Sequence, residues 1–419
     1  MKEKYAVLVG LDWADQKHDL QWRETDTGEV HTMVLPQSPE ALHEWIGTLR
    51  AKYPEGRIAV CLEQSRGAVV YALMGYGNLD LYPVNPLTLS EYRKAFHPSG
   101  AKDDPVDAGL LFDLLERHPE ILKVWHPDTE STRLLRSLGE DRRKAVDLRT
   151  GLCHSLRARL KEYFPQALNL VGDSLYSPLC CAFLLKWPRF EAIAAARPET
   201  IRKFYYAHHS RSESLIQQRL EHIATSRPLC TDAAVVEAAL FWVRTLVPQI
   251  RALNRAIQDY DQRIDQLFKA HPDHFLFRSF PGAGPQLAPR LLTAFGTDRS
   301  RYARAGEATN YFGISPVIER SGQQQWIHWR WHCPKFLRQS LVEFAGNSIR
   351  FCPWAKVYYY QQLQRGKRHQ AAVRALAFKW IRILFRCWQQ RTPYDEAKYL
   401  DSLRRHGSWI PKQLQSATE

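Results

Sequence analysis

The stretch Ala6-Val7-Leu8-Val9-Gly10-Leu11-Asp12 decides how the start of the chain folds. It is a short apolar run that ends in a carboxylate, the pattern of a buried strand whose last residue reaches a sheet edge. A second apolar run, 57–62, delivers Glu63 just past its end. Both runs therefore predict strands that bring an acid to the edge of a sheet.

Two more acids begin an apolar helical pattern at 104–117. Asp104 and Asp107 are three residues apart, which places two carboxylates on one helix face, about one turn from each other. Four acids gathered at one sheet edge repel one another unless a divalent cation neutralises them, and oxygen-only ligands suit Mg²⁺, with Mn²⁺ as an alternative. We therefore take Asp12, Glu63, Asp104 and Asp107 as the candidate metal and catalytic site.

The order of the predicted elements indicates an α/β fold for the first part of the chain. The pattern predicts strands at 5–12, 19–25, 29–35, 57–62 and 80–84, and helices at 39–52, from Gly67, at 88–96 and at 104–117. Three meandering strands followed by alternating helix and strand is the order of an RNase H-like sheet. In that architecture the first strand, a later strand and a helix supply the acids, as predicted here.

The middle of the chain is predicted to be helical. A long helix runs from Asp128 to Tyr163, four prolines divide 166–232 into short pieces, and a second long helix begins near Asp232. The first helix has its apolar positions at Leu134, Leu138, Leu148, Leu152, Leu156 and Leu160. The second has them at Val236, Leu240, Val243, Val247, Ile250, Leu253, Ile257, Tyr260, Ile264 and Leu267.

Gaps of three and four in the second helix are typical of a coiled-coil seam. Pro248 sits at the one discontinuity of this seam, and it predicts a kink or a break. The seam could pack on the 128–163 helix of the same chain or on a second subunit, and the sequence leaves both open.

The net charge of +14 is confined to the last third of the chain. The range 281–419 holds 22 Lys and Arg against 8 Asp and Glu, while the first 280 residues are neutral. This part is also rich in tryptophan, and its arginines outnumber its lysines, which indicates recognition of a phosphate polyanion. The Pro281-Gly-Ala-Gly284 turn that opens it fits a helix-hairpin-helix motif on a nucleic-acid backbone, although a plain interhelical turn has the same pattern.

Composition also excludes some classes of protein. No stretch approaches 18 uninterrupted apolar residues and no basic, apolar leader opens the chain, so we expect no membrane association and no secretion. The eight cysteines include no CxxC pair, which fits a reducing bacterial cytoplasm better than a zinc or disulfide framework.

The acids resemble the N-terminal DEDD motif of a large family of bacterial insertion-sequence transposases. The resemblance rests on Asp12, Glu63 and the box Lys102-x-Asp104-x-x-Asp107-Ala108. Further motifs similar to that family's are Pro281-Gly-x-Gly284, Tyr311-x-Gly313-Ile314-x-Pro316, Ser321-Gly322, Lys335, Leu337-Arg338 and Tyr394-Asp395. Asp103 stands where the family commonly has a small polar residue, so whether Asp103 or Asp104 faces the metal stays open.

The resemblance implies a domain order and an activity. It implies a RuvC-like domain at 1–125, a coiled-coil region at 126–275 with an insertion at 166–232, a mostly helical transposase domain at 276–400 and a tail at 401–419. It also implies a site-specific recombinase guided by a structured non-coding RNA, the bridge RNA, which pairs with donor and target double-stranded DNA. Carried over by position, Ser321 would form a covalent phosphoserine beside the metal, with Arg320, His328, Arg330 and His332 supplying positive charge. Because recombination must bring two duplexes and two nucleophiles together, we also expect a homodimer held by the 236–267 seam, with two dimers pairing into a tetramer.

Two other functions fit the same residues. A metal-dependent RuvC-like nuclease or junction resolvase would use water as its nucleophile and Ser321 as a structural residue. A nucleic-acid-binding protein with a degenerate centre would bind without cutting. On its residues alone, Ser321-Gly322 predicts only a turn.

Overall fold

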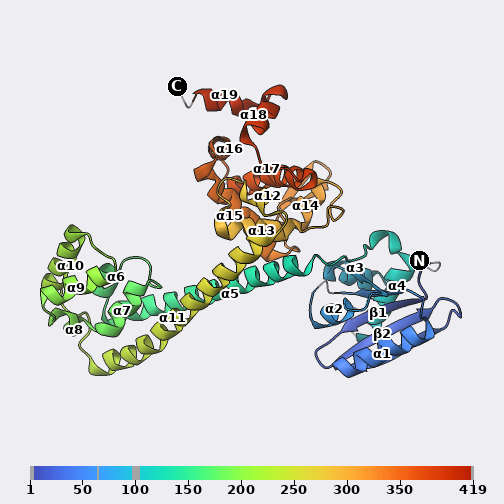
Figure 1. Ribbon diagram of the computed structural model, residues 1–419, viewed down its shortest axis with the longest axis horizontal. Coiled ribbons are helices and arrows are strands. Elements are labelled where there is room, and N and C mark those ends of the chain that lie inside the picture. Colours follow the sequence, from blue (N-terminus) through green and yellow to red (C-terminus); the bar gives the residue numbers. More distant parts are fainter. Residues whose placement is uncertain (1–3, 64–65, 97–103, 417–419) are drawn as a thin grey trace. The chain divides into compact units, whose positions relative to one another are not determined.

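Figure 1 shows the computed structural model of the chain, which describes residues 4–63, 66–96 and 104–416. The chain divides into two compact units, the first ending at Pro127 and the second beginning at Asp128. The division falls where a mixed α/β part gives way to a helical part.

The first unit is built on a five-stranded sheet with strand order β3-β2-β1-β4-β5. Its elements are β1 (Val7–Trp13), β2 (Lys17–Glu24), β3 (Val30–Pro36), α1 (Pro39–Lys52), β4 (Ile58–Leu62), α2 (Ala68–Leu73), β5 (Leu79–Pro83), α3 (Pro86–Phe96), α4 (Asp104–Arg117) and the 3₁₀ helix η1 (Pro119–Ile121). The first three strands are antiparallel, and β4 and β5 continue the sheet in parallel with β1. The predicted RNase H-like order is confirmed.

The two faces of β1 pack against different helices because side chains alternate along a strand. Val9 joins the core under α1 with Ile46, while Leu8 joins the core under α4. Gly10 lies on the α4 side, where a Cβ atom would stand 2.2 Å from the carbonyl oxygen of Ala108. Only glycine therefore allows α4 to lie this close to β1.

The second unit is helical apart from one hairpin. Its elements are α5 (Glu130–Tyr163), α6 (Gln166–Val171), α7 (Pro178–Lys186), α8 (Phe190–Ala194), α9 (Pro198–Ala207), α10 (Glu213–Thr225), α11 (Ala233–Ala270), α12 (His274–Arg278), α13 (Gly284–Phe295), α14 (Ala305–Tyr311), β6 (Val317–Ser321), β7 (Gln324–His328), α15 (Lys335–Phe351), α16 (Pro353–Gln364), α17 (His369–Gln390), α18 (Glu396–Arg405) and α19 (Trp409–Ser416). The segment 166–232 is a set of short helices, as its prolines predict.

The seam of α11 packs along α5 of the same chain (Figure 1). Ile257 and Ile264 are buried there, and Arg142 on α5 binds Asp261 on α11 with N–O distances of 2.6 and 3.1 Å. The intramolecular alternative is therefore the one that the structure contains. The predicted break at Pro248 is absent, because α11 runs through it with the proline on the exposed side.

One core cluster lies at each end of the α5–α11 pair. Helices α6–α10 enclose one with α5 and α11, and helices α12–α19 enclose the other. The tail predicted from about Arg404 is instead helical through Ser416, and Ile410 on α19 is buried in the second cluster. By length and hydropathy α11 alone among the described helices could cross a membrane, but its apolar stripe packs on α5.

The α5–α11 seam predicts how a charge at Ile257 acts. Ile257→Asp would bury an unpaired carboxylate between helices of one chain, so we expect the free energy of unfolding to fall by more than about 3 kcal/mol. Thermal or urea unfolding measures this loss, and Gln258→Asp, on the exposed side of α11, is the control and should change little. An unchanged unfolding midpoint together with a halved mass in light scattering would place the seam between subunits instead.

Candidate active site

The ends of β1 and β4 bring two of the predicted acids together. These strands are parallel neighbours with Leu11 opposite Leu62, so Asp12 and Glu63 are the next residues in register. Adjacent strands lie about 4.8 Å apart. Side chains alternate along a strand, so Asp12 and Glu63 continue the set of positions that faces α4, which includes Leu8 on β1 and Cys61 on β4. Both acids are partly exposed. The sheet therefore presents two carboxylates side by side beneath the start of α4.

The start of α4 carries the remaining acids. Asp107 lies in its first turn, one residue before the contact between Ala108 and Gly10. Asp104 is the first residue of α4, but its side chain is not among those described, and Asp103 lies outside the described residues. Three of the four predicted positions thus meet at one end of the sheet by topology, and the fourth begins the same helix turn.

The Asp107 carboxylate already has a cationic partner. It is 1% exposed, and Arg93 on α3 donates to both of its oxygens at 2.6 Å. The pair is bidentate, which is the strongest geometry for such a contact. The carboxylates of Asp12 and Glu63 are the type of ligand that an oxygen-bound divalent cation takes, and Asp107 fits such a cation only if Arg93 releases an oxygen.

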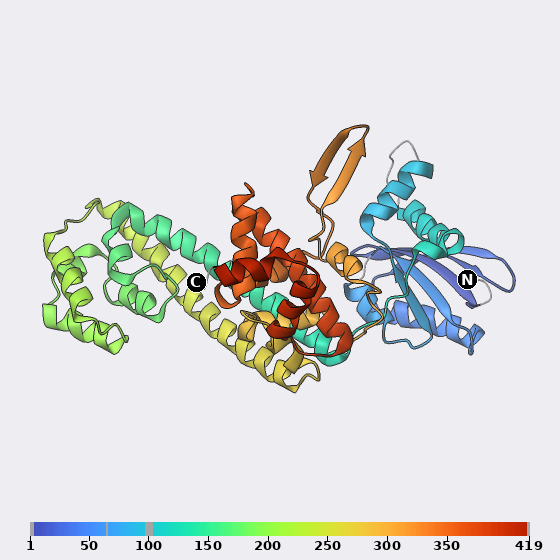
Figure 2. The same ribbon diagram turned by 90° about the horizontal axis from the view of Figure 1, so that it is seen from above.

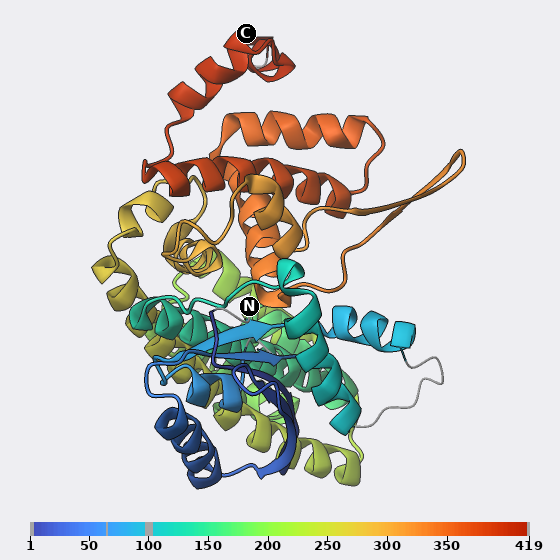
Figure 3. The same ribbon diagram turned by 90° about the vertical axis from the view of Figure 1, so that its right-hand side faces the viewer.

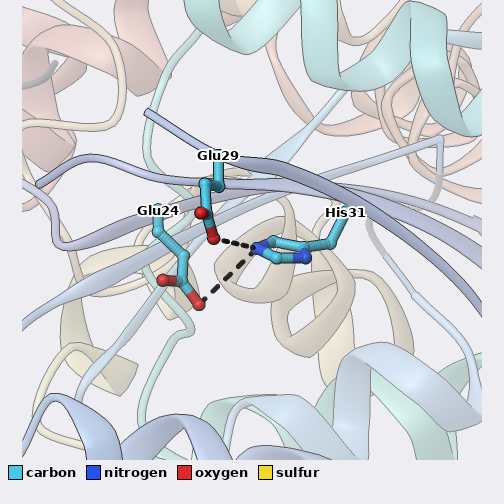
Figure 4. A group of neighbouring side chains, drawn as sticks. All are labelled: Glu24, Glu29 and His31. Carbon is cyan, nitrogen blue, oxygen red and sulfur yellow. Dashed lines mark ion pairs between the residues drawn. The ribbon is translucent and has the colours of Figure 1, made fainter. Parts of the chain in front are cut away.

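A different group of acidic and histidine side chains lies at the opposite end of the sheet. Figure 4 shows Glu24, Glu29 and His31, with the His31 Nε2 atom 3.8 and 3.7 Å from the two carboxylates. Lys52 also binds Glu24 and lowers the pKa of that carboxyl. Glu24 pairs with the first residue of β1, whereas Asp12 is near its last. We therefore interpret Glu24, Glu29 and His31 as a group of ion pairs that is separate from the candidate site.

Ser321 lies in the second unit, at the tip of the β6–β7 hairpin. Figures 2 and 3 show this hairpin, drawn in orange, standing clear of the helices of its unit. Ser321 is exposed and pairs with Gln324 across a two-residue loop. Gly322 has φ +57° at the first loop position, which type II′ turns reserve for glycine. The Ser-Gly pair is therefore a turn that also presents a hydroxyl group.

The register of the hairpin decides which side chains share a face with Ser321. Glu319 and His328 lie on that face and form an ion pair at 3.1 Å. Arg320 lies on the opposite face because neighbouring strand residues alternate. The expectation that Arg320 supplies positive charge for the phosphate stays a prediction, because the register shows only that its side chain leaves the hairpin on the other face.

The hairpin is fixed to its unit by the motif that precedes it. Phe312 and Ile314 are buried in the core of α12–α19. Gly313 has φ +68°, and a Cβ there would stand 2.3 Å from the sulfur of Cys333. Burial raises the pKa of the Cys333 thiol, which makes it a poor rival nucleophile. The geometry of the hairpin base thus depends on one glycine and two apolar anchors.

The Pro281–Gly284 turn joins α12 to α13 and packs on α15. A Cβ at Gly282, where φ is +80°, would stand 3.2 Å from the backbone of Asn347. Close packing between helices accounts for this glycine without a phosphate contact. The first three residues of α13, 284–286, are nevertheless exposed.

One stretch of the second unit is strongly basic. From Arg320 to Tyr394 the chain has 14 Lys and Arg and a single acid, Glu343. Arg290 and Arg143 already bind that acid, at 2.6 and 3.2 Å. The surface formed by these residues therefore favours a polyanion.

An enzyme that acts on nucleic-acid phosphodiesters is the class of protein that this sheet edge and this basic unit define. Known families support that assignment. The IS110-type DEDD family described as transposase matches residues 9–165, and the transposase family IS116/IS110/IS902 matches 275–360. The two stretches together make up more than half of the chain.

Similar proteins span nearly the whole chain. A Streptomyces coelicolor protein, the mini-circle transposase candidate for IS117, is 27% identical over 95% of this chain and 97% of its own length. The 43.6 kDa protein of insertion element IS110 from the same organism is 24% identical over 94% and 96%. The 42 kDa protein of IS900 from Mycobacterium paratuberculosis is 23% identical over 93% and 98%.

The chain belongs to the IS110 family of insertion-sequence transposases, which cleave and rejoin DNA. The DEDD domain indicates that the activity depends on a divalent metal ion.

The ion pair between Arg93 and Asp107 generates a stability prediction. Arg93→Gln leaves a buried carboxylate without its cation, and removing one partner of a buried pair costs about 3–5 kcal/mol. We expect amide hydrogen exchange of α4 to become faster, measured by mass spectrometry. Arg50→Gln, on the exposed side of α1, is the control. Adding Asp107→Asn to Arg93→Gln should recover part of the protection, and unchanged exchange in Arg93→Gln would contradict the pairing.

Proposed function

We propose that this transposase exchanges DNA strands through a covalent phosphoserine at Ser321. The observation that carries the proposal is the position of Ser321 at the exposed tip of a hairpin whose base is fixed in a basic unit. A hydroxyl at such a tip can reach a phosphodiester in a DNA groove, whereas a buried serine could not.

The chemistry conserves the number of phosphodiester bonds. The Ser321 oxygen attacks the phosphorus, the bond to the 3′ oxygen breaks, and the serine proton passes to that leaving oxygen. The freed 3′-hydroxyl then attacks the phosphoserine of the partner duplex, which joins the strands and restores serine. No external energy source is needed, because each bond broken is replaced by one formed.

The acids of the first unit would complete the site. Asp12, Glu63, Asp104 and Asp107 would hold the divalent ion, for which we propose Mg²⁺. When bound, such an ion stabilises charge that develops on the phosphate and leaving oxygen. Before the metal binds, the contact with Arg93 would keep the Asp107 carboxylate oriented. On metal binding, Arg93 would have to release one oxygen of that carboxylate.

Sequence choice would come from a guide RNA rather than from side chains. The family resemblance suggests a structured RNA that pairs with donor and target DNA, and a protein that grips backbones needs basic surface rather than base-reading residues. The balance of 14 basic residues to one acid over 320–394 supports such a surface. Action in the bacterial cytoplasm on nucleoid DNA fits this role.

Strand exchange needs two nucleophiles and two duplexes, so we propose a homodimer that pairs into a tetramer. The α11 seam is occupied by α5 of its own chain. The contact between subunits would therefore use another surface.

The sheet-edge acids can be tested without disturbing DNA binding. Asp12→Asn and Glu63→Gln should each abolish DNA cleavage in Mg²⁺, with affinity for nucleic acid changed less than about threefold. Asp107→Asn and Asp104→Asn should also abolish cleavage. Asp15→Asn, an exposed acid just after β1, is the matched control, and Asp103→Asn should be far milder. Normal recombination by any two of the four site variants would refute the metal site.

Ser321 has a more direct test. Ser321→Ala should eliminate both strand exchange and the SDS-stable protein–DNA adduct on a denaturing gel, with the thermal midpoint unchanged because one exposed hydroxyl contributes little to stability. Gln324→Ala, its exposed partner across the hairpin, should keep the adduct. Cleavage that persists in Ser321→Ala would favour the metal-only nuclease, in which water is the nucleophile.

A further inference from the structure

The base of the hairpin carries an indole that the core does not use. Trp331 follows β7 and is 71% exposed, more than any other large hydrophobic residue of the described chain. Its ring lies 6.4 Å from that of Trp329, at an angle of 57°. A large aromatic side chain that is this exposed, beside a basic surface, offers a face on which a ligand can stack.

Two arginines lie over the neighbouring indole, and the backbone of a third is held beside them. The guanidinium groups of Arg374 and Arg338 lie 4.0 and 4.9 Å from the Trp329 ring centre. Arg338 also donates to the backbone carbonyl oxygen of Arg330 at 3.2 Å, which places that residue next to Arg338. The arginines come from α17, α15 and the segment after β7, so separate elements converge on one point.

These arginines lack an anionic partner within the described residues. None of the three forms an ion pair there, and the Nε atom of Arg330 is buried without a hydrogen-bond acceptor. Burial and the charge of Arg338 lower the pKa of Arg374, which shows that the cations repel one another. A phosphate oxygen would relieve this repulsion.

The site is rigid before any ligand arrives. Gly313 packs against Cys333, and Leu337 on α15 and Val373 on α17, each next to an arginine of the group, are buried in the core. Groups held by core packing lose little conformational entropy on binding.

We propose that Trp331 and the three arginines Arg330, Arg338 and Arg374 form a binding site for one unstacked nucleotide of the DNA strand that is cut. The indole stacks on the base, and the guanidinium groups bind the adjoining phosphates. In a paired duplex both faces of a base are covered by its neighbours, so the site selects a strand that has been opened. This inference rests on the proposed function, because strand exchange is what opens the DNA.

The hairpin sets the distance between this site and the cut. From Gln324, opposite Ser321, to Trp331 is seven residues, or at most about 24 Å at 3.4 Å per residue. Duplex DNA advances about 3.4 Å per nucleotide along each strand. The bound nucleotide therefore lies no more than about seven positions from the scissile phosphate, and fewer if the strand is stretched.

The test measures binding with full-length Ser321→Ala protein, so that no DNA is cut. Fluorescence anisotropy compares a duplex that carries a five-thymine single-stranded gap with a fully paired duplex of equal length. Trp331→Ala should weaken binding of the gapped DNA about tenfold, the effect of losing one stacking indole, and binding of the paired duplex less than twofold. Trp331→Phe keeps an aromatic face and should restore most of the affinity.

Matched controls separate the site from general losses. Trp242→Ala removes another exposed indole, 42% exposed, from α11, and Arg386→Gln removes a charge from the helix that carries Arg374. Both should have smaller effects on gapped DNA than Trp331→Ala and Arg374→Gln.

Two results would overturn the inference. One is equal affinity of Trp331→Ala and its parent for gapped DNA, or an equal loss on both DNAs. The other is a Trp331-dependent preference for a five-uridine RNA gap over the thymine gap, which would assign the site to RNA. Neither outcome bears on the serine, because the adduct assay with unmodified Ser321 tests that nucleophile separately.

Discussion

The approach of α4 to β1 at Gly10 is the contact on which the acid site depends. A side chain at this position would collide with the backbone of α4 at Ala108 and Phe112. Moving α4 outward would carry Asp107 away from Asp12 and Glu63, which the sheet register fixes independently. The position of Asp107 relative to the two strand-end acids therefore depends on this one helix–strand contact. The contact exists because position 10 has no side chain.

The second unit follows a similar logic around its hairpin. An isolated two-stranded hairpin is at best marginally stable in water, and β6–β7 exposes nearly all of its side chains. What fixes it is its base, where Phe312 and Ile314 enter the core and Gly313 admits Cys333. The tip is exposed while its base is packed in the core, an arrangement that would suit the proposed nucleophile Ser321.

Sequence reasoning succeeded where burial and period were strong. The apolar runs that end at Asp12 and Glu63 gave their strands directly, and the parallel register then made their proximity a consequence of topology. The spacing of apolar residues also predicted the seam of α11, but it could not predict that the seam packs on α5 of the same chain. On α5 the leucine pattern misled: Leu148 is 64% exposed, whereas Ala145 and Cys153 are buried against the neighbouring helices. Small residues face a close helix partner, which leucine counting overlooks.

Other features depend on tertiary contacts that leave no local pattern. Nothing around Arg93 indicates that it binds Asp107, because the two lie on different helices. Pro248 removes one backbone donor from α11, yet packing on α5 holds the helix together. The hairpin strands escaped prediction because polar and apolar residues on 317–328 are all exposed and their alternation carries no burial signal.

Mapping the covalent bond tests the central claim most directly. The unmodified protein would be incubated in Mg²⁺ with DNA and guide RNA, the adduct digested with protease and nuclease, and the modified peptide sequenced by mass spectrometry. The account predicts a phosphoryl-nucleotide mass on Ser321 that is absent when EDTA removes the metal. Cleaved DNA with free 5′-phosphate ends and no adduct, or an adduct on another residue, would contradict it.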